Sequence, residues 1–407
     1  MSLRYGRDFL SIPGPSVMPD RVLNAMHRGA PNIYEGALPD MVAGLYEDLK
    51  RVARTKTGRV AAYIANGHGA WEAAVSNALS KGDKVLVLDC GRFAAGWGEM
   101  ARRMGCEIEL MEAEDGRPND PAALEARLRA DAGGEIKAVM LVQVDTASSA
   151  TNDVPAMRAA IDAAGHDALF MVDCIACLGS VPLEFDAWTI DVLVAGSQKG
   201  LMTPPGLSFV WMSEKAWARQ GDLVTSYWDW SVRAEPEVFY QRFCGTAPTH
   251  HLFALREALT MLLDEEGLEA AWARHEVMGD AVRACVAGWS EGATGAGGVS
   301  FLVADAAARS NVVTSILAKG FDPDAMRRYA EAEMGLTIGI GLGRFGGTAF
   351  RIGHMGWLNP PMILGTLGAA EAAMRACGVP LASGLDAAAQ VVADALPAPR
   401  TEELAAQ

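Results

Sequence analysis

The chain has 407 residues, half of them hydrophobic, and a formal net charge of −15 at pH 7. This acidic balance excludes non-specific nucleic-acid binding, which needs clustered Lys and Arg side chains, and no apolar run is long enough to span a bilayer. The length predicts two domains, and residues 1–15 lack the apolar core of a secretory signal.

Amphipathic helical stretches alternate with short apolar runs between residues 60 and 215. The expected strands are 84–90, 106–112, 137–144, 168–174, 190–196 and 207–212. Because near-continuous apolar strands need both faces covered, this pattern predicts an α/β fold with a mostly parallel sheet. Ligands bind at the carboxyl ends of such strands. Lys199, Asp173, Asp145 and Thr146 all lie at or just after these ends.

The second half of the chain changes character. Residues 213–250 are irregular and rich in aromatic side chains, and helical periodicity then resumes. After the glycine-rich stretch 291–298, a smaller α+β segment is expected, with strands at 299–305 and 347–353 and helices at 323–335 and 360–378. The predicted organisation is an N-terminal arm (1–20), a large domain (21–270), a small domain (271–380) and a C-terminal helix and tail (381–407).

Lys199 follows an apolar strand, where a charged amine is costly to desolvate. One interpretation is a lysine that reaches the surface past the strand; the other is a neutral amine that binds an aldehyde covalently. Asp173 ends another apolar strand, and its carboxylate is costly to bury unless a cation meets it. Pyridoxal 5′-phosphate (PLP) accounts for both residues, with Lys199 bound to C4′ and Asp173 paired with the protonated pyridine nitrogen.

Two further elements complete the predicted site. The glycine loop 66–72 opens a helix, so its backbone N–H groups and the helix dipole favour a phosphate there. Arg351 follows an apolar strand and precedes a turn, where a guanidinium holds a carboxylate through two parallel hydrogen bonds. The spacing Gly341-x-Gly343-x-x-Gly346 matches a dinucleotide-binding fingerprint, but it precedes a strand, and we interpret it as coincidence.

The seven cysteines are scattered without framework spacing, which indicates a reducing, cytoplasmic environment. Cys174 and Cys177 form a C-x-x-C pair without a second pair or a nearby pair of histidines, so no metal site is predicted. A redox role for the pair stays open, but two small buried hydrophobic side chains are the favoured interpretation.

These residues resemble the class V aminotransferases of PLP fold type I, in the branch of the serine–glyoxylate and alanine–glyoxylate enzymes. The resemblance is carried by the segments 6–26, 67–79, 196–209, 227–230, 246–259 and 350–358. It implies a large domain with a mostly parallel seven-stranded sheet between helices, a smaller C-terminal α+β domain, and a homodimer whose subunits share their active sites.

The resemblance also implies individual roles. Lys199 carries the cofactor and moves the proton during transamination, and Asp173 pairs with the pyridine nitrogen. Arg351 holds the α-carboxylate of the amino or oxo acid. The remaining cofactor contacts are implied for Gly67, His68, Gly69 and Gln198 at the phosphate, Phe93 stacked on the ring, and Thr246 reaching the phosphate of the neighbouring subunit.

Two segments depart from that branch. The loop 145–150 reads D-T-A-S-S-A where the family has E-T-S-T-G-V, so the hydroxyl near the cofactor's 3′ oxygen is either Thr146 or Ser148. The lost glycine predicts a reshaped loop. Residues 31–36 lack the family's His-Arg pair, and Tyr34 is expected to line the partner's pocket. This second change leaves the amino donor open.

The sequence therefore predicts a PLP-dependent transaminase that moves the amino group of serine, alanine or aspartate to glyoxylate or a similar 2-oxo acid in ping-pong order. Aspartate would need a second cation, for which Arg344 is a candidate, although a solvated loop arginine is the simpler interpretation. The alternative is another class V enzyme, a cysteine desulfurase or a lyase; desulfurases carry His before the lysine, where this chain has Gln198. A non-catalytic PLP-binding protein is the third hypothesis.

Overall fold

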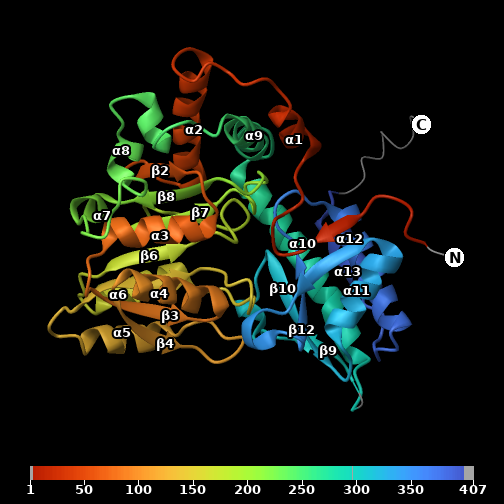
Figure 1. Cartoon of the computed structure of the whole chain (residues 1–407). Coiled ribbons are helices and arrows are strands. Elements are labelled where there is room, and N and C mark those ends of the chain that lie inside the picture. Colours follow the sequence, from red (N-terminus) through yellow and green to blue (C-terminus); the bar gives the residue numbers. More distant parts are fainter. Residues whose placement is uncertain (1–2, 296, 398–407) are drawn as a thin grey trace.

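The computed structural model describes residues 3–295 and 297–397, which form two sheets with separate helical covers (Figure 1). The first sheet has the strand order β2 (Arg59–Tyr63), β8 (Ser208–Met212), β7 (Val192–Gly196), β6 (Leu169–Asp173), β5 (Ile136–Val142), β3 (Lys84–Asp89) and β4 (Glu107–Glu112). Strands β7, β6, β5, β3 and β4 are parallel, whereas β8 is antiparallel to both of its neighbours. The predicted mostly parallel seven-stranded sheet is confirmed.

Helices cover both faces of this sheet. One face packs against α3 (Gly67–Ala78) and α4 (Arg92–Met104), and the other against α2 (Ala37–Ala53), α5 (Pro121–Arg129), α6 (Val154–Ala163) and α9 (Thr249–Leu259). Strand β3 shows the alternation that this requires: Val85 and Val87 join the α3 side, and Leu86 joins the opposite side. Asp120 and Asp153 cap α5 and α6, each of which has proline in its first turn.

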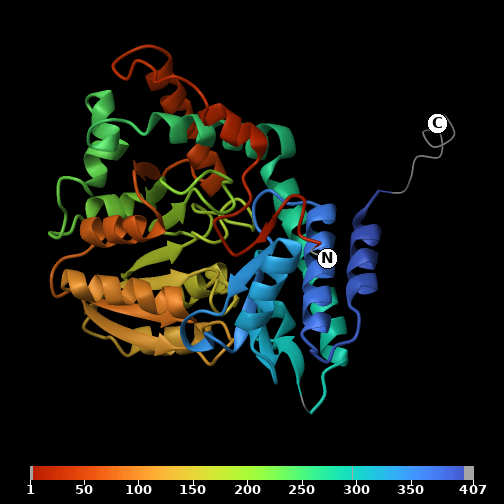
Figure 2. The same cartoon turned by 45° about the vertical axis from the view of Figure 1, so that its right-hand side comes forward.

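The second sheet has the order β1 (Phe9–Ser11), β11 (Leu336–Ile340), β12 (Ala349–Gly353), β10 (Val313–Lys319) and β9 (Gly298–Phe301). It packs with α10 (Leu268–Glu291), α11 (Pro323–Met334), α12 (Pro360–Ala376) and α13 (Leu385–Ala395) around its own hydrophobic core. Figure 2 shows the N-terminal segment lying beside these elements, because β1 pairs with β11 in parallel. The predicted domain boundaries stay predictions, and residues 398–407 of the expected tail lie outside the described residues.

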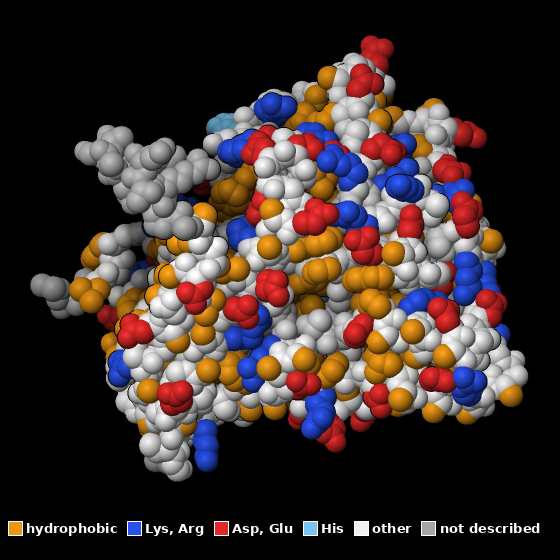
Figure 3. All heavy atoms as spheres, turned by 180° about the vertical axis from the view of Figure 1, so that it is seen from behind, with side chains coloured by type: hydrophobic (Ala, Val, Ile, Leu, Met, Phe, Trp, Pro, Cys, Tyr) orange, Lys and Arg blue, Asp and Glu red, His pale blue; other side chains and the backbone are white. Residues whose placement is uncertain are grey.

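The remaining elements are short. They are α1 (Asp20–Met26), α7 (Glu214–Ala218), α8 (Trp230–Ala234), the 3₁₀ helices Phe239–Phe243, Ala306–Ala308 and Gly343–Phe345, and a π-helical turn at Thr260–Glu266. Acidic and basic side chains are interspersed over the face shown in Figure 3. Within residues 3–295 and 297–397, every helix is too short or too polar to cross a membrane.

Candidate active site

A cavity of about 250 Å³ lies at the carboxyl ends of β5, β6 and β7 and at the start of α3. It is lined by Asn66, Gly67, His68, Trp71, Phe93, Val142, Val144, Thr146, Asp173, Ile175, Ala176, Gln198 and Lys199. Most of the cofactor residues predicted from the sequence are therefore brought together in one place. The edge of the sheet is the one expected for ligand binding.

Lys199 follows β7, and the N-terminal arm holds its segment in place. Ser16 donates its backbone N–H to the Gln198 carbonyl (2.9 Å) and its hydroxyl to the Lys199 carbonyl (2.8 Å). The Lys199 amine donates to the carbonyl of Pro13. Burial, together with the nearby Arg351 charge, lowers the pKa of the amine to about 8. About a tenth of this amine is therefore uncharged at pH 7, far more than for an ordinary lysine, and the uncharged form is the nucleophile.

Asp173 is the last residue of β6 and is 3% exposed. One carboxylate oxygen accepts the Ile175 backbone N–H (2.6 Å), and the other accepts the indole N–H of Trp71 (2.7 Å). Burial nevertheless raises the pKa of the carboxyl to about 7. A cation in the cavity would favour its ionised form, which is the environment that a pyridinium nitrogen needs.

The start of α3 has the features of an anion site. The Asn66 side chain caps the helix by accepting the His68 N–H (3.1 Å). A side chain at position 67 would press against Ile175 (2.6 Å) and one at position 69 against Ala65 and Trp228, so both positions need glycine. Among the described residues, the buried Gln198 Oε1 has no hydrogen-bond partner. Backbone N–H groups at the helix N-terminus and the side-chain amide N–H groups of Gln198, which lines the cavity, can donate to a phosphate.

The Thr146 and Ser148 hydroxyls of loop 145–150 have different surroundings. Thr146 lines the cavity. Ser148 is fully buried, and its hydroxyl contacts the Asp145 carbonyl (3.5 Å) and accepts the Ala150 N–H (3.2 Å) within its own loop. Asp145 accepts the N–H groups of Phe93 (2.7 Å) and Ala94 (3.1 Å), which holds the first turn of α4 beside the cavity. This role of Asp145 was not predicted.

Ser149 occupies the place of the family's glycine and adopts the left-handed backbone conformation, with φ of 66°. Its hydroxyl lies 2.6 Å from that of Ser315, whose register partner across β10 and β12 is Arg351. The Ser315 hydroxyl also donates to the Ala147 carbonyl (3.2 Å). These contacts link the loop of the first sheet to the strand that flanks Arg351.

Ser149→Ala is expected to destabilise the fold more than Ser149→Gly. Alanine loses the hydrogen bond and keeps the left-handed strain, whereas glycine loses the bond but removes a strain of about 1 kcal/mol. We expect the alanine variant to lose about 1–2 kcal/mol of unfolding free energy and the glycine variant about 1 kcal/mol less than that. Urea unfolding of both variants measures the difference, and equal losses would contradict a strained Ser149.

Arg351 lies on β12 and is 7% exposed. It donates Nε–H to the Ile340 carbonyl (2.6 Å) and an NH1 hydrogen to the carbonyl of Thr146 (2.7 Å), a residue of the cavity lining, although Arg351 itself is not part of that lining. Burial lowers its pKa to about 10. Arg344, the candidate second cation, instead pairs with Asp115 at the surface. The simpler interpretation of Arg344 agrees with this pairing.

Tyr34 and Thr246 do not line the cavity of this subunit. Tyr34 is 86% exposed, and Thr246 is also exposed. Both roles inferred for them involve a second subunit, so they stay predictions. Cys174 and Cys177 are buried and both donate to the Gln143 side-chain oxygen (3.0 and 3.3 Å), away from the cavity lining.

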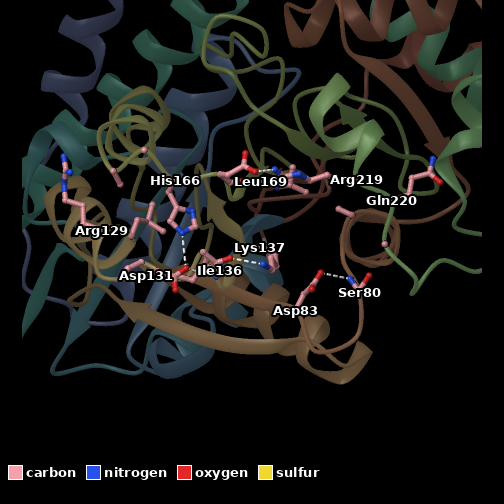
Figure 4. A pocket seen from close by; sticks show the side chains of 18 residues that line it. Ser80, Asp83, Arg129, Asp131, Ile136, Lys137, His166, Leu169, Arg219 and Gln220 are labelled. Atoms are coloured by element: carbon pink, nitrogen blue, oxygen red, sulfur yellow. Dashed lines mark hydrogen bonds and ion pairs between the residues drawn. The ribbon is translucent and has the colours of Figure 1, made fainter.

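A larger cavity of about 670 Å³ lies at the opposite edge of the first sheet, where β3, β5 and β6 begin. Figure 4 shows His166 pointing at Asp131, and their side chains are 3.0 Å apart. Arg219 pairs with Asp167, and Lys137 donates to the Gly134 carbonyl. Because these charged groups bond to one another and to the loops that carry them, we place the candidate active site in the smaller cavity.

The parallel sheet with a buried lysine and aspartate at its carboxyl edge defines an α/β enzyme of the PLP fold type I class. The chain belongs to the class V aminotransferase family, whose model matches residues 52–342. It is 39% identical to the serine–glyoxylate aminotransferase of Methylorubrum extorquens, over 95% of this chain and 96% of the relative. It is 33% identical to the L-aspartate–glyoxylate aminotransferase of Paracoccus denitrificans (93% and 94% covered).

A solved structure of an aminotransferase has the same fold. The pyridoxamine–pyruvate aminotransferase of Mesorhizobium loti superposes with a TM-score of 0.87 at 27% identity, covering 97% of this chain and all of that one. The predicted family and fold are confirmed.

Proposed function

We propose that this protein is a PLP-dependent transaminase that moves the amino group of a small L-amino acid to glyoxylate or a similar 2-oxo acid in ping-pong order. The observation that carries the proposal is that a half-buried amine of lowered pKa, Lys199, and a buried carboxylate of raised pKa, Asp173, line one cavity. The similarity to the serine–glyoxylate enzyme favours serine as donor, with alanine and aspartate as alternatives.

The residues of the cavity fit PLP in charge and in hydrogen bonding. Asp173 would hold the pyridine nitrogen, Phe93 the ring face and Thr146 the 3′ oxygen, because Ser148 bonds within its own loop. The phosphate would lie at Gly67, His68 and Gly69, where the side-chain amide N–H groups of Gln198 could donate to it. When bound, this cofactor supplies an electron sink for charge that develops at the substrate Cα.

Lys199, Pro13 and Arg351 each have a role in the proposed reaction. The Lys199 amine would hold the cofactor covalently, and as a free amine it would accept the proton from the substrate Cα. The Pro13 carbonyl accepts a hydrogen bond from the same amine and keeps it inside the cavity. Arg351 orients the α-carboxylate, because its backbone hydrogen bonds use Nε and NH1 and leave its NH2 group for the substrate.

The proposal includes a homodimer, in which a second subunit completes each active site. Tyr34, Val238, Tyr240 and Tyr227 are large hydrophobic side chains that stay exposed in the single chain, as expected for an interface. A homodimer would bury them and would bring Thr246 and Tyr34 to the partner's cavity. We also propose a cytoplasmic location, where the described cysteines stay reduced.

The proposed reaction is tested by mixing the PLP-loaded protein separately with L-serine, L-alanine and L-aspartate. The visible absorption of the bound cofactor should decline most rapidly with serine and return when glyoxylate is added. A faster decline with alanine or aspartate would correct the donor. If no donor gave a decline that glyoxylate reversed, the transaminase proposal would fail, and desulfurase and lyase substrates would be tested next.

Covalent capture of PLP by the apoprotein should accelerate with pH and level off near pH 8, because only the uncharged Lys199 amine reacts with the aldehyde and its pKa is lowered to about 8. Below that pH the rate constant should fall about tenfold per pH unit. Stopped-flow absorbance from about pH 6.5 to about pH 10.5 measures this. Pyridoxamine phosphate, which has no aldehyde, is the control. A capture rate still rising steeply above pH 9.5 would contradict the lowered pKa.

A further inference from the structure

Trp71 donates its indole N–H to Asp173 Oδ2 at 2.7 Å. The indole is 2% exposed and lies in the first turns of α3, the helix that begins at the phosphate end of the cavity. The Ile175 N–H binds the other carboxylate oxygen at 2.6 Å. Each oxygen of Asp173 therefore holds one donor from the protein, and the orientation of the carboxylate is fixed from both sides.

Aromatic side chains pack against this indole. Trp97 stacks on it, with ring centroids 6.1 Å apart and an interplanar angle of 14°. His68 lies at 4.5 Å and Phe93 at 6.3 Å from it, both at tilted angles. Trp97 is equally buried, but among the described residues its own indole N–H has no hydrogen-bond partner. Of the two stacked indoles, Trp71 therefore donates a hydrogen bond to Asp173 and Trp97 does not.

We infer that Trp71 is a positioning residue that keeps Asp173 ionised and aimed at the pyridine nitrogen of the cofactor. The inference rests on the proposed PLP-dependent function. It does not follow from the sequence pattern, in which Trp71 is one apolar position of a helix.

The physical reason lies in where the proton between Asp173 and the ring nitrogen resides. Burial raises the pKa of Asp173, and the bonds from Ile175 and Trp71 oppose that rise. Without the indole N–H, the carboxylate becomes a stronger base and draws the proton from the ring nitrogen. The ring then withdraws electrons less strongly, and the ion pair that holds the cofactor weakens.

Trp71→Phe keeps an aromatic ring and removes the N–H. We expect the dissociation constant of PLP to rise about tenfold and kcat to fall about tenfold, while the KM of the amino donor changes less than about twofold. Trp97→Phe is the matched control, because it removes an indole N–H that makes no bond; all three quantities should stay within about twofold of wild type. Equal effects of the two variants would show that Trp71 only fills space.

A double-mutant cycle with Asp173→Asn decides whether Trp71 acts through the carboxylate charge. Trp71→Phe should cost much less in PLP affinity and kcat when Asp173 is already neutral; an unchanged cost would overturn the inference. Melting temperatures of both Phe variants report the folding effect, and Trp71→Met, which also has no donor, replaces Trp71→Phe in the cycle if that variant does not fold. A wild-type protein that fails to bind PLP would instead refute the proposed function itself.

Discussion

Lys199→Ala is expected to lower kcat/KM by a factor of about 10⁴ or more. The substitution removes both the amine that links the cofactor and the base that accepts the substrate proton. The cavity stays otherwise intact, because the Lys199 backbone is held by Ser16 and not by its own side chain. We therefore expect the variant to fold, to lose the covalent link to PLP, and to regain part of its activity with small primary amines.

Lys137→Ala is the control for this loss. Lys137 lies in the same sheet but at the opposite edge, where its amine donates only to the Gly134 carbonyl. Its replacement should leave kcat/KM within about twofold of wild type, as is usual for an exposed side chain. Steady-state kinetics and mass spectrometry after borohydride reduction read out activity and attachment. If Lys199→Ala kept more than about one hundredth of the activity, another residue would have to be the base.

The sequence was informative wherever burial on both faces imposes a simple pattern. The six strands expected in the first sheet all form. Five of them are interior strands that are apolar at nearly every position, whereas the edge strand β4 alternates Glu with apolar residues. Strand β2 was not predicted, since its alanine-rich sequence has low β-propensity. Strands β10 and β11 were also missed, because one-sided antiparallel strands with Thr, Ser and Gly carry no continuous apolar run.

In the candidate site, too, the sequence predicts some features and not others. Lys199 and Asp173 stand at strand ends, where a charged residue is conspicuous. Contacts between segments far apart in the chain are not encoded locally: the bond from Trp71 to Asp173 and the pairing of Arg344 with Asp115 depend on how α3 and the second sheet dock. The choice between Thr146 and Ser148 likewise needed the loop geometry that a left-handed Ser149 creates.

Asp173→Asn is expected to lower kcat by about 10³-fold while leaving the fold intact. Asparagine has the same shape, but its single amide oxygen can accept only one of the two hydrogen bonds that Ile175 and Trp71 donate to separate oxygens of Asp173. It also carries no charge to pair with a pyridinium. The ring nitrogen then loses its proton at neutral pH, and the electron sink weakens. Asp191→Asn is the matched control, because Asp191 is equally buried but lies at the opposite edge of the sheet, bonded to Phe170 and Ser213.

The apoprotein offers a second measurement of the same substitution. Because burial raises the Asp173 pKa from 3.8 to about 7, the folded apoprotein binds more protons than the unfolded chain across that range. Asp173 therefore lowers the unfolding free energy as pH rises through this window, and its penalty is complete above about pH 7. Asp173→Asn removes the penalty, so the apo variant should melt above apo wild type at pH 8 and close to it near pH 4. An apo variant less stable than wild type at pH 8, with activity retained, would mean that Asp173 is a structural residue and that the cofactor's nitrogen is held elsewhere.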